Sequence, residues 1–227
     1  MDFSKTRAIL FDLDGTLVDS APDLTAAVNQ MLAEQGQPPV QEEQVRNWVG
    51  NGARRLVARA LTGADDGEVD DEQLDPALER FFAFYETGVY VHSHPYPGVV
   101  EGVRALAAAG YRLAVVTNKP RRFAEPILER MGIVAQIDAV VGGECTEARK
   151  PDPEPLRLAM ERLGAASATV LMVGDSATDV EAARNAGIPV VCVPYGYRRG
   201  VGLEDLAADA LIDELTELPA LLRGARA

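Results

Sequence analysis

Short apolar runs alternate with segments of helical periodicity along the second half of this chain. The run 113–117 follows one helical stripe that ends at Gly110 and precedes another that ends at Gly132, and glycine is the residue that most often terminates a helix. Near-continuous apolar runs of this length are typical of parallel strands buried on both faces. The pattern therefore predicts an α/β fold, a Rossmann-like parallel sheet with helices on both faces. The candidate strands are 7–13, 113–117, 137–141, 170–173 and 190–193.

The segment from about residue 20 to residue 91 has a different pattern, with helical periodicity and no convincing strand. Ser20 and Asp23 predict the start of its first helix, with Ser20 as the N-cap and Asp23 in the capping-box position. We interpret the segment as an all-helical domain inserted into the α/β domain. The expected division is 1–16 and 95–227 for the α/β core and 17–94 for the helical insert.

The charge of the chain argues against several classes of partner. Its net charge is −13 and its isoelectric point is near 4.6, which disfavours binding to nucleic acid or to an anionic membrane. No segment approaches the roughly 20 apolar residues that span a bilayer. Cys145 and Cys192 do not make a disulfide framework and fit a reducing compartment. We therefore expect a cytoplasmic protein, a monomer or a homodimer, with no nucleic-acid or membrane partner.

Polar side chains gather just beyond the predicted strands. In a parallel sheet, the carboxyl ends of the strands meet at one edge, and ligands bind there. We therefore expect these side chains to converge, because an aspartate that merely caps a helix explains any one of them but not the whole set. The candidates are Asp12, Asp14 and Thr16 after the first run, Thr117 and Asn118 after the second, then Lys150, and Asp175 and Asp179 after the fourth.

The aspartates in this set predict a metal site. Asp12 and Asp14 lie two residues apart, so on an extended backbone both side chains point to the same face. Carboxylates this close repel each other, and a hard divalent cation relieves the repulsion; an all-oxygen site of carboxylates selects Mg²⁺. If Asp14 is neutral, Mg²⁺ and Lys150 balance the other three carboxylates. The pocket can then admit a phosphate dianion, so we expect a small phosphate ester as the partner.

In order and spacing, these residues resemble the four motifs of the haloacid dehalogenase superfamily. The motifs are Asp12-x-Asp14-Gly15-Thr16, Thr117-Asn118, Lys150-Pro151 and Gly174-Asp175-x₃-Asp179. The match spans almost the whole chain, and the helical insert looks like that superfamily's cap domain of the type placed between the first two motifs. Residues 17–94 are accordingly termed the cap, with expected hinges near 17–20 and 92–97 that let it close over a substrate.

The resemblance implies that the first motif carries the chemistry of a phosphatase. Asp12 would attack phosphorus and form an aspartyl-phosphate. Asp14 would protonate the leaving group and then deprotonate the attacking water, and its backbone carbonyl would also bind the metal.

The resemblance implies binding roles for the remaining motif residues. Asp175 would complete the protein ligands of the metal, and Asp179 would orient waters on it. Thr117 and Lys150 would hold the transferring phosphoryl oxygens, where electrostatic stabilisation matters most. The expected metal set is then Asp12, Asp14, Asp175 and Asp179.

Finer details resemble bacterial phosphoglycolate phosphatases, a group within that superfamily. In the cap, Gly50-Asn51-Gly52 precedes a helix and exposes backbone N–H groups that suit an anion. Arg54 lies in the first helical turn after it and suits the carboxylate of 2-phosphoglycolate. A glycine-rich turn with solvated arginines explains these cap residues equally well. The expected substrate-binding residues are Thr16, Asn118, Asn51, Gly52 and Arg54.

Other functions share part of this pattern. Similar phosphatases that act on N-acetylmuramic acid 6-phosphate or on pyrophosphate carry the same core motifs, so the core does not separate them from a phosphoglycolate phosphatase. A sugar phosphomutase usually carries valine at the position of Thr16, and a catalytically silent binding protein has usually lost one of the motif aspartates. Both rank lower, and the sequence favours Mg²⁺-dependent hydrolysis of 2-phosphoglycolate to glycolate and phosphate.

Overall fold

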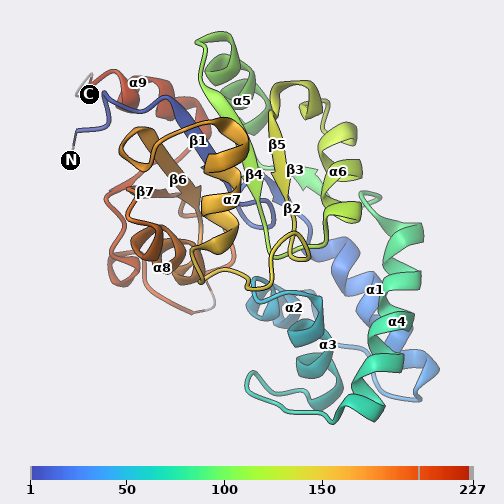
Figure 1. The fold of residues 1–227 in the computed structure, drawn as a ribbon. Coiled ribbons are helices and arrows are strands. Elements are labelled where there is room, and N and C mark those ends of the chain that lie inside the picture. Colours follow the sequence, from blue (N-terminus) through green and yellow to red (C-terminus); the bar gives the residue numbers. More distant parts are fainter. Residues whose placement is uncertain (1, 199, 225–227) are drawn as a thin grey trace.

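The computed structural model describes residues 2–198 and 200–224, which form an α/β core with a helical cap at one end (Figure 1). The core contains a six-stranded sheet in the order β5-β4-β1-β6-β7-β8, and every neighbouring pair is parallel. The α/β prediction is confirmed, and β8 is a short strand that the apolar pattern did not indicate. The strands are β1 Ala8–Phe11, β4 Arg112–Val116, β5 Ala139–Val141, β6 Val170–Gly174, β7 Val190–Cys192 and β8 Ala210–Leu211.

Helices cover both faces of this sheet. Because side chains alternate along a strand, Ile9 and Phe11 of β1 face one hydrophobic cluster while Ala8 and Leu10 face a second one. The second cluster contains the buried face of α7 and α8, and the first contains that of α5, α6 and α9. The core helices are α5 Val99–Ala108, α6 Arg121–Arg130, α7 Glu154–Leu163, α8 Ala177–Ala186 and α9 Leu218–Leu222. Single 3-10 turns occupy η1 Val134–Gln136, η2 Ser167–Thr169, η3 Glu204–Leu206 and η4 Leu215–Glu217.

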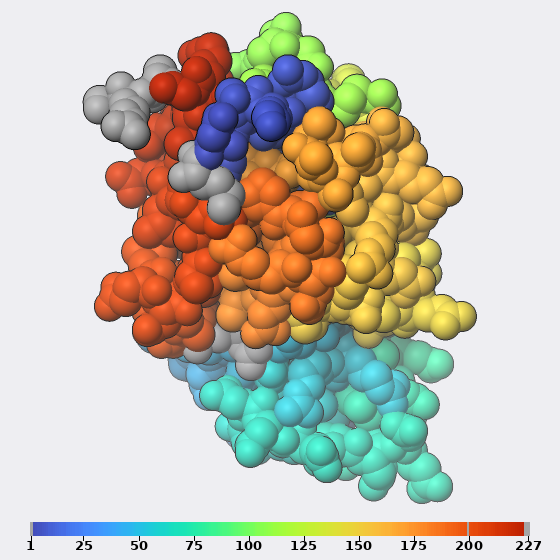
Figure 2. All heavy atoms as spheres, turned by 60° about the vertical axis from the view of Figure 1, so that its left-hand side comes forward, coloured from blue at the N-terminus to red at the C-terminus, as the bar shows by residue number. Residues whose placement is uncertain are grey.

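The cap is built from helices, and α1 packs along α4. In the space-filling view it projects beyond one end of the core (Figure 2). The chain passes between core and cap at β2 Val18–Asp19 and β3 His94–Pro95, which pair as a short antiparallel ribbon. None of the described helices is both long and apolar enough to cross a membrane. The cap helices are α1 Ala21–Glu34, α2 Glu42–Trp48, α3 Ala53–Thr62 and α4 Asp71–Gly88.

The start of α1 differs from the expected capping box. The helix begins after Ser20, but the Ser20 side chain makes no capping bond and its hydroxyl donates to the Asp14 carboxylate instead. The Asp23 carboxylate accepts from the backbone N–H groups of residues 91–93 at 2.8 to 3.0 Å. Asp23 is buried. Its carboxylate is bound by three backbone donors of residues 91–93, where the chain returns from the cap to the core. It therefore clamps the end of the cap against the beginning of α1.

We predict that Asp23→Ala lowers the free energy of unfolding by about 2 kcal/mol, because it leaves the buried N–H of Ser93 and the half-buried N–H groups of residues 91 and 92 without an acceptor. Urea unfolding followed by circular dichroism measures this loss. Glu79→Ala on the exposed side of α4 serves as the control and should stay within about 0.5 kcal/mol of the parent. A loss for Asp23→Ala no larger than the control's would show that water replaces the clamp.

Candidate active site

The motif residues meet at the carboxyl edge of the sheet. Asp12, Thr117 and Asp175 directly follow β1, β4 and β6, the three central strands. Backbone pairing continues through this edge, since the Asp12 N–H donates to Val173 O and the Thr117 N–H to Val141 O, each at 2.9 Å. These side chains are therefore held by extensions of the sheet itself.

Three buried carboxylates form a cluster that fits a metal ion. Ligand oxygens of Asp12, Asp175 and Asp179 lie within 4.8 Å of one another, and all three residues are buried. Asp175 is fixed by the Thr16 hydroxyl at 2.8 Å and by the Tyr197 N–H at 2.6 Å. A compact set of carboxylate oxygens is the donor chemistry of a hard divalent cation. The Asp14 carboxylate lies outside this cluster. The sequence analysis expected Asp14 to contribute its backbone carbonyl to the metal, and that role stays a prediction.

Lys150 joins two of the clustered carboxylates. Its Nζ lies 2.8 Å from Asp12 Oδ1 and 2.7 Å from Asp179 Oδ1. Burial raises the pKa of Asp12 to about 7 despite the opposing effect of Lys150, and burial together with Asp179 raises the pKa of Asp175 well above its ordinary value. Burial alone would lower the pKa of Lys150, but the two carboxylates outweigh it and raise that pKa. Lys150 is therefore a charged group in a site that holds an excess of negative charge.

Lys119 is a site residue that the sequence analysis missed. Its Nζ lies 2.8 and 2.9 Å from the two carboxylate oxygens of Asp14, and both side chains are nearly inaccessible. Asp14 raises the pKa of Lys119 against the lowering effect of burial, so the pair is ionic. The sequence feature that could have indicated a role for Lys119 in the site is its position directly after Thr117 and Asn118, beyond the end of the same strand.

Thr16 and Asn118, expected to bind substrate, contact other site residues. The Thr16 hydroxyl donates to Asp175, as described above. Asn118 Oδ1 accepts from the Lys150 N–H at 3.0 Å, and its Nδ2 donates to Lys150 O at 3.0 Å and to Gly50 O at 2.9 Å. Asn118 thus fixes the loop that carries Lys150 and joins it to the cap, while its side chain also lies at the wall of the cavity described next.

A cavity of about 40 Å³ lies between core and cap. The core contributes Asp12, Asp14, Thr117 and Lys119 to its wall, and the cap contributes Gly52 with a set of largely apolar side chains. The cavity therefore has a charged end at the strands and an apolar wall on the cap. The apolar cap members are Leu24, Val49, Leu56, Phe81 and Tyr85.

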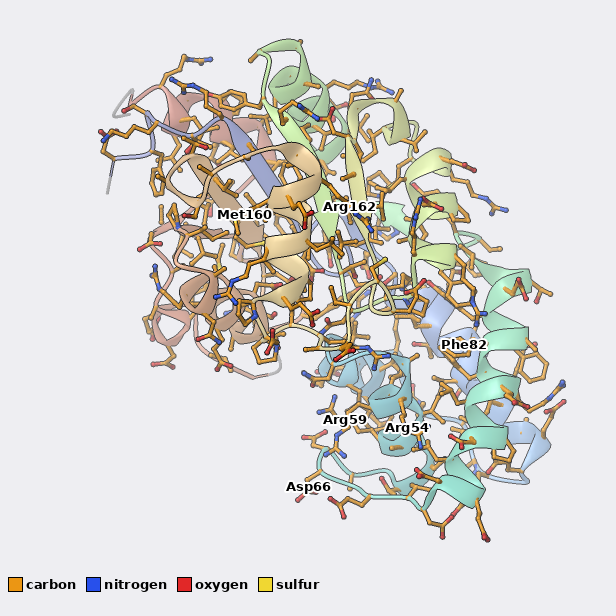
Figure 3. The ribbon with its side chains drawn as sticks, viewed as in Figure 1. Arg54, Arg59, Asp66, Phe82, Met160 and Arg162 are labelled. Atoms are coloured by element: carbon orange, nitrogen blue, oxygen red, sulfur yellow. The ribbon has the colours of Figure 1, made fainter. Side chains whose placement is uncertain are left out.

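The structure does not bring the other two cap candidates into this cavity. Asn51 Oδ1 accepts from Arg59 Nη2 at 3.1 Å. Arg54 forms ion pairs with Asp71 and Asp75, and its side chain is 41% exposed; Figure 3 labels it in the cap, on α3. Of the expected cap residues, Gly52 alone lines the cavity.

Tyr197 connects the carboxylate cluster to residues 19–21, where the chain enters the cap, and through Asp19 to α2. Its N–H binds Asp175, and its hydroxyl accepts from the N–H groups of residues 20 and 21 and donates to Asp19 at 2.6 Å. Asp19 also accepts from Arg46 Nη2 of α2 at 2.7 Å. The position of the cap is therefore linked by hydrogen bonds to a residue of the carboxylate cluster.

The comparisons with known proteins agree with this geometry. A family model for haloacid dehalogenase-like hydrolases matches residues 9–193. The chain is 44% identical over 217 residues to "Phosphoglycolate phosphatase" of Nitrosospira multiformis, covering 96% of both proteins. It is 46% identical over 220 residues to "Phosphoglycolate phosphatase, plasmid" of Cupriavidus necator, covering 96% of this chain and 94% of that protein.

A solved structure extends the agreement to the arrangement of core and cap. The crystal structure of a predicted phosphoglycolate phosphatase from Haemophilus somnus superposes with a TM-score of 0.89 at 35% identity, covering 96% of this chain and 98% of that one. The resemblance of the four motifs is thus confirmed by similarity over nearly the full length. The chain belongs to the haloacid dehalogenase-like hydrolases.

Proposed function

We propose that this chain is a Mg²⁺-dependent phosphatase that hydrolyses 2-phosphoglycolate through an aspartyl-phosphate on Asp12. The observation that supports it best is the buried cluster of Asp12, Asp175 and Asp179, with Lys150 bridging two of them and Asp12 facing the cavity. The relatives named phosphoglycolate phosphatase supply the choice of ester.

Charge balance supports a divalent cation at the cluster. When Asp12, Asp14, Asp175 and Asp179 are all ionised, the ammonium groups of Lys119 and Lys150 leave two negative charges uncompensated. Without a metal, the raised pKa values of Asp12 and Asp175 favour bound protons in its place. One Mg²⁺ cancels the two negative charges and, when bound, stabilises negative charge on the phosphoryl oxygens. The sequence-based balance took Asp14 as neutral and left Lys119 out. With Lys119 counted and one Mg²⁺ bound, the site is neutral when Asp14 is a carboxylate and carries one positive charge when Asp14 holds the proton that it gives to the leaving group.

The side chains divide the reaction between them. The Asp12 carboxylate attacks phosphorus, and the bond from phosphorus to the ester oxygen breaks. Asp14, which also faces the cavity, gives a proton to that leaving oxygen and later takes one from the water that hydrolyses the aspartyl-phosphate. Lys150 and Thr117 bind the phosphoryl oxygens during transfer. The products are glycolate and inorganic phosphate, and Asp12 is regenerated.

The names of the relatives carry the choice of ester. The proteins named phosphoglycolate phosphatase cover 96% of this chain, so the similarity includes the cap. This favours 2-phosphoglycolate over N-acetylmuramic acid 6-phosphate and pyrophosphate.

Asp12→Asn keeps the shape of the side chain but removes the nucleophile. We predict that kcat for 2-phosphoglycolate falls at least ~10⁴-fold in saturating Mg²⁺, while the circular dichroism spectrum stays that of the parent. Phosphate release measures the effect. Asp66→Asn, an exposed cap residue labelled in Figure 3, is the matched control and should keep parent activity. Undiminished turnover in Asp12→Asn would rule out the covalent mechanism.

Substrate choice is tested by a comparison of three esters. We expect kcat/KM for 2-phosphoglycolate to exceed that for N-acetylmuramic acid 6-phosphate and for pyrophosphate by at least ~10²-fold, a difference of about 3 kcal/mol in transition-state binding. Phosphate release with Mg²⁺ and with chelator provides the values. A preference for one of the other two compounds would agree with the phosphatase mechanism but would reject 2-phosphoglycolate as the substrate.

The raised pKa of Asp12 predicts how Mg²⁺ binding depends on pH. With a folded pKa of about 7 against an ordinary 3.8, the metal-free folded protein binds more protons than the unfolded chain between these pH values. Its stability therefore falls as pH rises through this window, and Mg²⁺ competes with the bound protons. We predict that 5 mM Mg²⁺ raises Tm more at pH 7.5 than at pH 5.5, measured by calorimetry against chelator.

Asp175→Asn provides the control, because it removes a carboxylate from the cluster and should abolish the Mg²⁺-dependent rise in Tm at both pH values. Asp19 and Asp209 have lowered pKa values, so their titration lies below the pH range compared. A rise that is equal at the two pH values, or larger at pH 5.5, would contradict a site whose carboxylates hold protons near neutral pH.

A further inference from the structure

Tyr85 of α4 carries a buried hydroxyl that lacks a hydrogen-bond partner within the described part of the chain. The residue is 1% exposed, and its side chain lines the cavity between core and cap. Buried hydroxyls are nearly always hydrogen-bonded in native proteins, so an orphan at a cavity wall points to a group that enters the cavity. Burial raises the pKa of Tyr85 to about 12, so the hydroxyl keeps its proton and can donate it.

Lys119 reaches the same cavity from the core. Its Nζ lies 5.0 Å from the centre of the Tyr85 ring, and it is the one cation among the described residues that line the cavity. An ammonium has three N–H donors, and the two oxygens of Asp14 occupy two of them. One donor therefore remains besides these two, and the Tyr85 hydroxyl lies close enough to the ammonium to help Asp14 raise the pKa of Lys119. A carboxylate that enters the cavity can accept from both groups.

We propose that Lys119 and Tyr85 form a subsite for the carboxylate of the substrate, so that the enzyme selects short phosphate esters with an acidic group at the other end. The inference rests on the proposed function, which places the phosphoryl group at Asp12 on the wall of the same cavity. In this proposal Lys119, and not Arg54, binds the carboxylate of the substrate. Arg54 is paired with Asp71 and Asp75 outside the cavity, whereas Lys119 lines it.

The surroundings strengthen such a contact. Phe81, Leu56 and Phe123 line the cavity beside the two donors, and a charged hydrogen bond is stronger next to apolar side chains than in water. A phosphate ester without the carboxylate would fill the same space but leave both donors without an acceptor. A polar subsite discriminates in this way against an analogue that lacks the group it binds. Since Tyr85 belongs to the cap and Lys119 to the core, one carboxylate would contact both domains.

Two esters of equal length test the subsite. Ethyl phosphate replaces the carboxylate of 2-phosphoglycolate by a methyl group. The measured quantity is the ratio of kcat/KM for 2-phosphoglycolate to that for ethyl phosphate, in which any general loss of catalysis cancels. We expect Lys119→Met to lower this ratio ~100-fold and Tyr85→Phe to lower it ~10-fold, as charged hydrogen bonds of ordinary strength imply.

Two control variants separate the subsite from general effects. Arg122→Met also removes one positive charge, but from an exposed position near the start of α6. Tyr96→Phe removes another buried hydroxyl that has no hydrogen-bond partner within the described residues, and Tyr96 does not line the cavity. Both should leave the ratio unchanged. If Arg122→Met lowers the ratio as much as Lys119→Met, long-range charge and not a subsite selects the substrate.

The outcomes also separate the subsite from the proposed function. If the parent enzyme prefers 2-phosphoglycolate but neither variant changes the ratio, the proposed function stands and the subsite is overturned; Lys119 then serves only to hold Asp14. If the parent shows no preference, the subsite and the choice of 2-phosphoglycolate are both overturned, while the role of Asp12 is still decided by Asp12→Asn. Tyr85→Phe removes a single oxygen, so it decides the question even if Lys119→Met fails to fold, which thermal unfolding would reveal.

Discussion

The ion pairs of Lys150 with Asp12 and Asp179 hold the carboxylate edge of the sheet together. Burying carboxylates side by side costs several kcal/mol per ion unless each is paired and hydrogen-bonded. The rest of the site meets this demand: Asn118 fixes the Lys150 backbone from both sides, and Thr16 and the Tyr197 N–H bind Asp175. Residues that the motif pattern assigned to substrate therefore also hold the charges in place. What remains uncompensated is negative charge, which a divalent cation would balance.

The parts of the fold and site that follow from local sequence were predictable. An apolar strand and the polar residue just after it are adjacent in the chain, so Asp12, Thr117 and Asp175 could be placed at the sheet edge from sequence alone. Contacts between segments that are distant in the sequence could not be predicted in this way. Asp23 fits a capping box in its own helix, but donors about 70 residues away take its carboxylate. Arg54 follows a glycine turn that suits an anion, yet acidic residues of the next helix pair with it. In both cases a local pattern competes with partners that only the packed structure supplies.

Cap and core share one hydrogen-bonded network. Asn118 binds Lys150 on the core side and Gly50 on the cap side. Tyr197 binds Asp175 through its backbone and the first hinge through its hydroxyl, and Asp19 extends that link to α2. A movement of the cap would therefore break bonds that belong to residues next to the carboxylates.

The dense packing of carboxylates depends on the absence of side chains at two glycines. Gly15 has a φ of +92°, which favours glycine, and a Cβ added there would overlap the carboxylate of Asp175. A Cβ on Gly196 would overlap the same residue from the opposite segment. Any other residue at either position would push Asp175 away from Asp12 and Asp179 and would open the cluster. The glycines in Asp-x-Asp-Gly and Tyr-Gly-Tyr therefore create the space in which the carboxylates of Asp12, Asp175 and Asp179 approach one another.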